Sequence, residues 1–209
     1  MLLGRLLAAM AGIAALFAAL AVPSAPPPTQ DPDWPCQQRL VPHVTAAAYW
    51  NGLSLDNVGD WRADPAVADL VRRIAPRNVS TQEGLSEITA FVQSSPEDRP
   101  RRSALVFKGL LEETDRERAA LIDRLKQIGR RQRDVAALVE QLTIELDAIP
   151  PDAADETAAK RIDLQQRHDF TVRNFEEVQR TIRYACETPT ALEARLGAWA
   201  RLLQKAVEP

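Results

Sequence analysis

The chain has 209 residues, with 26 Lys and Arg against 29 Asp and Glu, which gives a formal net charge of −3. This near-balance gives no electrostatic basis for nucleic-acid binding, because proteins that bind nucleic acids concentrate positive charge. The 15 prolines and the scarcity of alternating Val, Ile and Thr exclude a convincing β-strand, so the sequence predicts an all-α protein.

The first 25 residues have the order of a secretory signal peptide. Arg5 precedes an uncharged run of Leu and Ala over residues 6–22, and small residues and prolines follow it. We expect cleavage near residues 21–25, preferably after Ala21. The alternative is an inner-membrane anchor formed by residues 6–22, since a spanning helix needs roughly 17–25 apolar residues. The sequence thus predicts a periplasmic or secreted protein that contacts a membrane only if this segment is retained.

Residues 26–60 are predicted to form an arm rich in proline and tryptophan. Its prolines are too dense for a helix or a central strand, except that residues 44–52 predict a short helix. Aromatic residues gather in and near this arm, and with one from the last helix they are expected to form the core of an aromatic base. The alternative is that they line a groove for a peptide or glycan. These residues are Trp34, Tyr49, Trp50, Trp61 and Trp199.

Residues 61–100 predict two short amphipathic helices. Asp64 is an N-cap followed by a proline at the first helical position, and Pro76 ends that helix. The second helix begins with a capping box formed by Ser80 and Glu83, and it ends before Pro96. Together with a C-terminal helix within residues 188–209, these helices are expected to pack around residues 104–111 as a base.

The most regular pattern lies in residues 101–149. Alternate steps of four and three residues from Phe107 to Ile149 meet an apolar side chain at every position except Thr114, Arg118 and Gln132. This period of 3.5 is typical of a coiled-coil seam. A second helical stretch follows the proline turn at residues 150–152 and places His168 in its seam, where it is expected to fix register or partner. Residues 101–187 therefore predict a long antiparallel helical hairpin, with a bend expected near Gly129.

The two cysteines are predicted to form a disulfide between Cys36 and Cys186, because export brings them into an oxidising compartment and no third thiol competes. The alternative is two separate buried cysteines. Counting back from the turn sets Cys186 beside residues 116–118, so the arm is expected to be clamped at mid-hairpin with Trp34 as its anchor. The motifs of known metal, cofactor and catalytic sites are missing from the sequence, and we expect no such site.

Beyond the predicted disulfide, residues 121–182 are expected to project as a stalk with few other elements to cover it. An apolar stripe of this length exposes more surface than one hairpin can bury, and such surface usually marks an interface. The residues predicted to bind a partner are Leu121, Leu125, Ile128, Val135, Val139, Leu142 and Phe175.

These features predict an exported, non-enzymatic adaptor or accessory protein. It would act through its hairpin on a protein partner or on a second copy of itself. The alternative is a periplasmic helical chaperone or ligand-binding module that uses the aromatic base, and an enzyme of unrecognised type ranks third.

Overall fold

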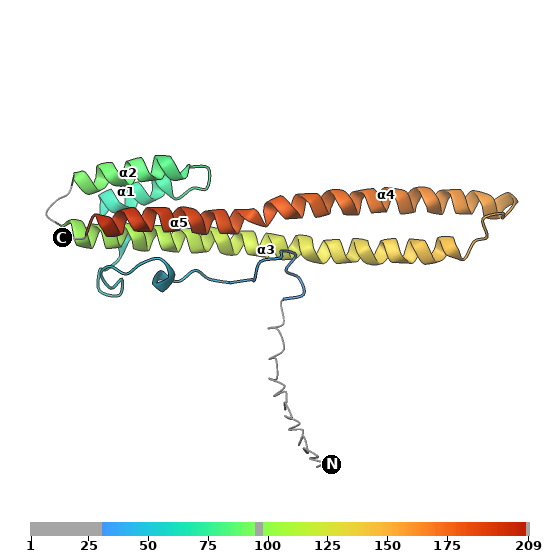
Figure 1. The fold of residues 1–209 in the computed structure, drawn as a ribbon, viewed down its shortest axis with the longest axis horizontal. Helices are drawn as coiled ribbons and strands as arrows, with labels where there is room; N and C mark the ends of the chain where they lie inside the picture. The colour runs from blue at the N-terminus through green and yellow to red at the C-terminus, as the bar shows by residue number, and fades with distance from the viewer. Residues whose placement is uncertain (1–30, 95–97, 208–209) are drawn as a thin grey trace, which may run out of the picture.

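The helix α3 (Arg99–Asp147) runs antiparallel to two successive helices, α4 (Asp155–Ala185) and α5 (Glu187–Lys205), in the computed structural model (Figure 1). Two shorter helices, α1 (Pro65–Ile74) and α2 (Thr81–Gln93), pack at one end of this hairpin. The structure describes residues 31–94 and 98–207, and within these ranges every regular element is helical. The predicted all-α class and antiparallel hairpin are confirmed, whereas the predicted signal peptide lies outside the described residues.

The short helices begin where local chemistry satisfies their first amide groups. The Asp64 carboxylate accepts hydrogen bonds from the backbone N–H groups of Ala66 and Val67, and Pro65 occupies the first turn of α1. At the start of α2, Ser80 and Glu83 form both hydrogen bonds of a capping box. Both predicted helix starts are therefore confirmed.

Two arginines satisfy helix ends that side-chain caps do not reach. Arg195 of α5 is buried and donates to the carbonyl oxygens of Ala75, Pro76 and Val79, just beyond α1. Arg161 of α4 donates to two carbonyl oxygens at the end of α3. Each guanidinium thus joins two helices through backbone carbonyls at or just beyond a helix end.

The base is the core in which α1, α2 and α5 pack around the first part of α3. Its central side chains, Phe107 of α3 and Trp199 of α5, are fully buried. The indole N–H of Trp199 donates to the carbonyl of Thr81, and its ring lies against Gly84 of α2. A Cβ atom at Gly84 would overlap that ring, so glycine is what allows α2 and α5 to approach this closely.

We expect Gly84→Ala to destabilise the base, with Gly197→Ala on α5 as the matched control. Both changes gain helix propensity, but a Cβ at Gly197 meets only atoms at 3.5 Å or beyond. Overpacking against Trp199 should leave Gly84→Ala about 1–3 kcal/mol less stable than Gly197→Ala in urea unfolding. Equal stabilities would show that Trp199 has room to move.

The helices α4 and α5 meet at a single residue, Cys186, which ends one and precedes the other. They form a long bent helix beside α3, and α5 begins at Glu187, one residue before the predicted range of 188–209. Pro189 stands in the first turn of α5, where the missing amide hydrogen costs no helical hydrogen bond.

The structure corrects three details of the predicted hairpin. Cys186 shares a buried cluster with Ile122 and Leu125 instead of lying beside residues 116–118. The shift arises because the first residues of α4 extend past the end of α3 (Figure 1). The residue that contacts the end of α3 is therefore Arg161, and later residues of α4 are displaced by the same amount. In addition, α3 continues unbroken through Gly129, and residues 44–52 form only the 3-10 turn Ala46–Ala48.

Candidate functional site

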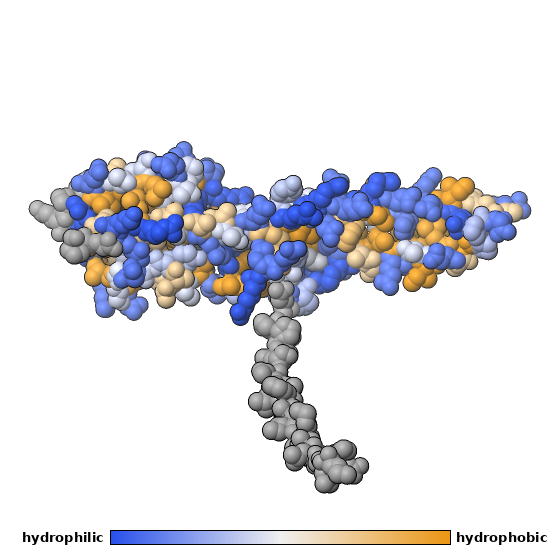
Figure 2. Space-filling view, viewed as in Figure 1, coloured by the Kyte–Doolittle hydropathy of each residue, from blue (hydrophilic) through white to orange (hydrophobic). Residues whose placement is uncertain are grey.

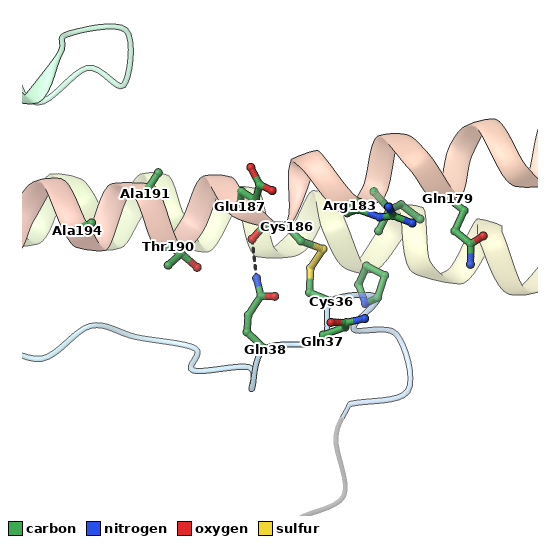
Figure 3. A pocket seen from close by; sticks show the side chains of 12 residues that line it. Cys36, Gln37, Gln38, Gln179, Arg183, Cys186, Glu187, Thr190, Ala191 and Ala194 are labelled. Carbon is green, nitrogen blue, oxygen red and sulfur yellow. Dashed lines mark hydrogen bonds between the residues drawn. A yellow bond between two sulfur atoms is a disulfide. The ribbon is translucent and has the colours of Figure 1, made fainter.

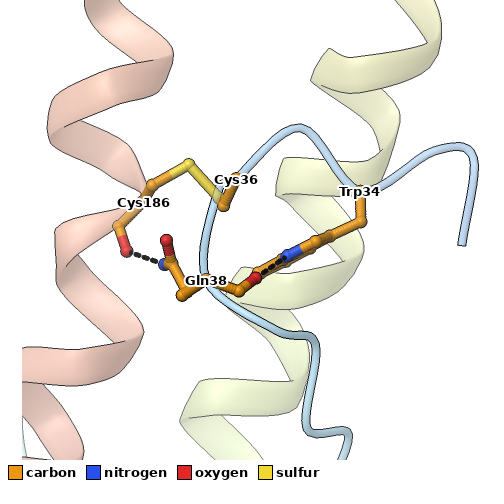
Figure 4. Close-up of a disulfide and its surroundings, with 4 residues drawn as sticks. All are labelled: Trp34, Cys36, Gln38 and Cys186. Carbon is orange, nitrogen blue, oxygen red and sulfur yellow. Dashed lines mark hydrogen bonds between the residues drawn. A yellow bond between two sulfur atoms is a disulfide. The ribbon is translucent and has the colours of Figure 1, made fainter. Parts of the chain in front are cut away.

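The arm crosses the hairpin at the disulfide between Cys36 and Cys186, which are 150 residues apart in sequence (Figures 3 and 4). The Trp34 side chain is only 8% exposed and packs in the same cluster as Ile122 and Leu125 of α3. Its indole N–H donates to the carbonyl of Gln38, and the Gln38 amide donates to the carbonyl of Cys186, over 2.7 and 2.5 Å. We call this arrangement the clamp, and it confirms both the predicted disulfide and the anchor role of Trp34.

Ion pairs extend the clamp along α3. Asp31 pairs with Lys126 at 2.8 Å, and Asp33 pairs with both Arg130 and Arg133. Between these contacts the arm backbone at Asp33 lies so close to α3 that a Cβ on Gly129 would overlap it. Gly129 is therefore required for close approach of the arm, which explains a glycine that the sequence analysis treated as a bend.

Removing the disulfide should destabilise the protein strongly. A cross-link that closes a loop of this length contributes up to about 5 kcal/mol by restricting the unfolded chain. We expect Cys36→Ala/Cys186→Ala to lose a large part of this free energy in guanidinium unfolding. Trp34→Ala in the oxidised protein is the comparison, because it removes packing but keeps the cross-link. A double variant as stable as the wild type would contradict this role.

Acid should weaken the ion pairs of the arm. Hydrogen bonds from Arg130 and Arg133 lower the pKa of Asp33, and the hydrogen bond from Lys126 lowers that of Asp31. A depressed folded-state pKa gives stability that is present above the unfolded pKa, about 3.9, and is lost as pH falls through the folded value. We therefore expect Asp31→Asn/Asp33→Asn to lower Tm at pH 7, and the difference from the wild type should shrink as pH falls below about 3.9. A Tm difference that is constant across this range would contradict the assignment.

An open groove of about 660 Å³ lies beside the clamp, between the arm and the junction of α4 with α5 (Figure 3). Its polar lining includes Gln37, Gln179 and Arg183. Glu187 and Thr190 also line it, so the groove presents amide, guanidinium, carboxylate and hydroxyl groups that can form hydrogen bonds.

Arg118 makes contacts that its predicted position in the seam did not indicate. It is 5% exposed, donates to Glu193 of α5 at 2.5 Å, and also bonds the carbonyls of Val41 and Pro42 in the arm. One side chain thus ties α3, α5 and the arm together. A charged residue at a seam position was the signal that could have indicated this role.

The distal stalk, meaning α3 and α4 over residues 121–182, contains the predicted partner-binding residues. Leu125 and Leu142 are buried between the helices. The others are half-buried: Leu121, Ile128, Val135, Val139 and Phe175. The stalk buries apolar clusters near the clamp and near the tip, and the predicted residues between these clusters remain partly open to solvent.

Polar groups occupy this middle part of the seam. The Gln132 amide donates to the carbonyl of Phe175 at 3.0 Å. The His168 Nε2 atom lies 3.2 Å from the Thr143 hydroxyl, and its Nδ1 atom lies 3.2 Å from an Asp169 oxygen. The Thr143 hydroxyl also donates to the carbonyl of Val139 in its own helix. This group can fix the register of the two helices.

Large apolar side chains are exposed on the distal stalk. They are Leu138 and Ile144 on α3, and Ile162 and Phe170 on α4, with exposed fractions from 41 to 68%. Figure 2 shows apolar patches among the charged side chains of this end of the protein. The sequence analysis missed these four residues because they lie outside the seam.

The predicted aromatic base divides between two places. Trp61 and Trp199 are buried in the base core, Trp50 stacks on Phe107 with ring centroids 4.7 Å apart, and Tyr49 packs against the same core. Trp34 instead lies in the clamp, which corrects its assignment to the base. Trp61 and Trp199 thus fill the interior of the base, whereas Tyr49 and Trp50 are partly exposed at its surface.

Three kinds of comparison bear on identity. No family model matches the chain, and no curated protein or solved structure is significantly similar to it. Among the described helices, none combines the length and the hydropathy of a membrane span. Within residues 31–94 and 98–207, no group of three His, Cys, Asp or Glu side chains is placed to hold a metal ion.

Proposed function

We propose that this protein is an exported adaptor that presents its distal stalk to a protein partner. The observation that carries the proposal is the exposure of Leu138, Ile144, Ile162 and Phe170 on the stalk. Among the described residues, these four exposed apolar side chains lie where no other element covers the hairpin, and the other large ones are Val41 and Leu53 of the arm and Tyr184 at the end of α4. Contiguous apolar surface on a soluble protein usually serves binding.

The clamp supports this proposal because it holds the stalk in a fixed relation to the base. The disulfide and Trp34 join the arm to α3 and to the end of α4. Arg118 joins the arm to α5 a few residues closer to the base. A partner bound at the tip would therefore be held at a defined distance from the base.

Export is the second part of the proposal. A disulfide between the two cysteines of the chain persists in oxidising compartments, outside the cytoplasm. The Leu- and Ala-rich run after Arg5 has the sequence order of a signal peptide. Both features favour a periplasmic or secreted protein over a cytoplasmic one.

Photo-crosslinking tests the proposed binding surface. With p-benzoylphenylalanine at Phe170 or at Ile144, irradiation of producing cells should yield discrete adducts at least fivefold above background. The control position is Arg72 on α1, which is also exposed but lies on the base. These solvent-facing substitutions should change stability by less than about 0.5 kcal/mol.

Two outcomes would contradict the adaptor proposal. One is a lack of adducts from both stalk positions, and the other is equal adduct formation at Arg72. No observation favours the alternative of a ligand site in the aromatic base, because Trp61 and Trp199 are buried there. That alternative stays a prediction.

A further inference from the structure

One stripe of α3 carries a self-complementary pattern. Arg124, Arg131, Leu138 and Glu145 are spaced seven residues apart, so they lie on one side of the helix, flanking its seam with α4. Leu138 is 41% exposed and stands at the centre of this stripe. The two bases precede it and the acid follows it at equal spacing.

Basic residues also precede acidic residues along the whole distal part of α3 and the turn after it. Residues 124–133 contain bases and no acid, whereas residues 134–152 contain acids and no base. The bases are Arg124, Lys126, Arg130, Arg131 and Arg133, and the acids are Asp134, Glu140, Glu145, Asp147 and Asp152. An antiparallel copy of α3 would set each segment against its opposite charge.

The arm neutralises only the bases outside this stripe. Lys126, Arg130 and Arg133 pair with Asp31 and Asp33. Arg124 and Arg131 are exposed, and neither forms an ion pair with another described residue. Arg124 and Arg131, which form no ion pair with the arm, are therefore the two bases that lie on the same stripe as Leu138.

We infer that the partner of the distal stalk is a second copy of this chain, bound antiparallel about a two-fold axis at Leu138. This inference rests on the proposed function and names the partner. In the dimer Leu138 meets its own copy and Arg131 meets Glu145 of the other copy. Arg124 then lies beside the turn that carries Asp152. Phe170 of α4 stands near the same level, because Gln132 and Thr143 of α3 contact Phe175 and His168 of α4.

The geometry leaves room for this dimer. Because α3 ends at Asp147, two copies overlap as helices from residue 129 to residue 147, which is about 27 Å, and two helices side by side are about 20 Å wide. The resulting face of about 540 Å² per copy is the size of a small, reversible interface. The arm does not obstruct it, since Gly129 lies about 200° around α3 from Arg131. The base core of each copy would fall about 27 Å beyond the end of the other α3.

Charge exchange tests the dimer and its direction. Purified full-length protein, with its disulfide intact, should sediment as a dimer at micromolar concentration in 50 mM salt and dissociate as salt rises. Arg131→Glu and Glu145→Arg should each raise the dimer Kd at least tenfold, because each sets like charges against each other across the axis. The double variant Arg131→Glu/Glu145→Arg should restore the wild-type Kd. In a parallel dimer residue 131 would meet its own copy, so the single reversals would not weaken it.

Glu140→Arg is the control, because it reverses a charge on the same helix away from the stripe and should leave the Kd within twofold. A monomeric wild type would overturn the inference, as would a dimer that the single reversals do not weaken or that the double variant does not restore. The adaptor proposal would survive any of these results if Phe170 still crosslinks in cells to a protein other than this chain. It would fail separately if neither stalk position forms adducts.

Discussion

The disulfide between Cys36 and Cys186 fixes the point at which the arm, α3 and the α4–α5 helix meet. Other contacts of the clamp depend on that point. Trp34 fills the space between the helices, Gln38 links Trp34 to Cys186, and Gly129 lets the arm backbone lie on α3. A single covalent bond therefore converts a proline-rich segment, which could not form a core by itself, into a brace across the hairpin.

Buried arginines join separate segments of the base, as the disulfide joins the arm to the middle of the hairpin. Arg195 donates hydrogen bonds to three carbonyls after α1. Arg118 donates to two carbonyls of the arm and to the carboxylate of Glu193. A guanidinium has five donors in a fixed plane, so it can satisfy several acceptors from different segments at once. The base is held by apolar packing and by these shared donors, whereas the distal stalk depends on two small clusters and a polar seam.

The parts of the structure that local chemistry determines were predictable from the sequence. Asp64, Ser80 and Glu83 mark helix starts through bonds to residues two or three positions away, and the period of 3.5 marks α3 along its length. The disulfide and the hairpin were also predictable, but the exact positions at which distant segments meet were not. The register of Cys186 depended on how far α4 extends past α3, and the role of Gly129 depended on the path of the arm. The exposure of Phe170 depends on where the other helices and the arm lie, which the sequence does not indicate.

The position of the clamp along α3 has a mechanical consequence. Ile122 and Leu125 lie near the midpoint of this 49-residue helix, so about 36 Å of helix extends toward the base and a similar length toward the tip. The disulfide thus lies midway between the base and the tip and joins the arm to the α4–α5 helix, while α3 is held at the same level by packing. Bending of the hairpin at this level would require the arm to move with the α4–α5 helix, because a covalent bond joins them.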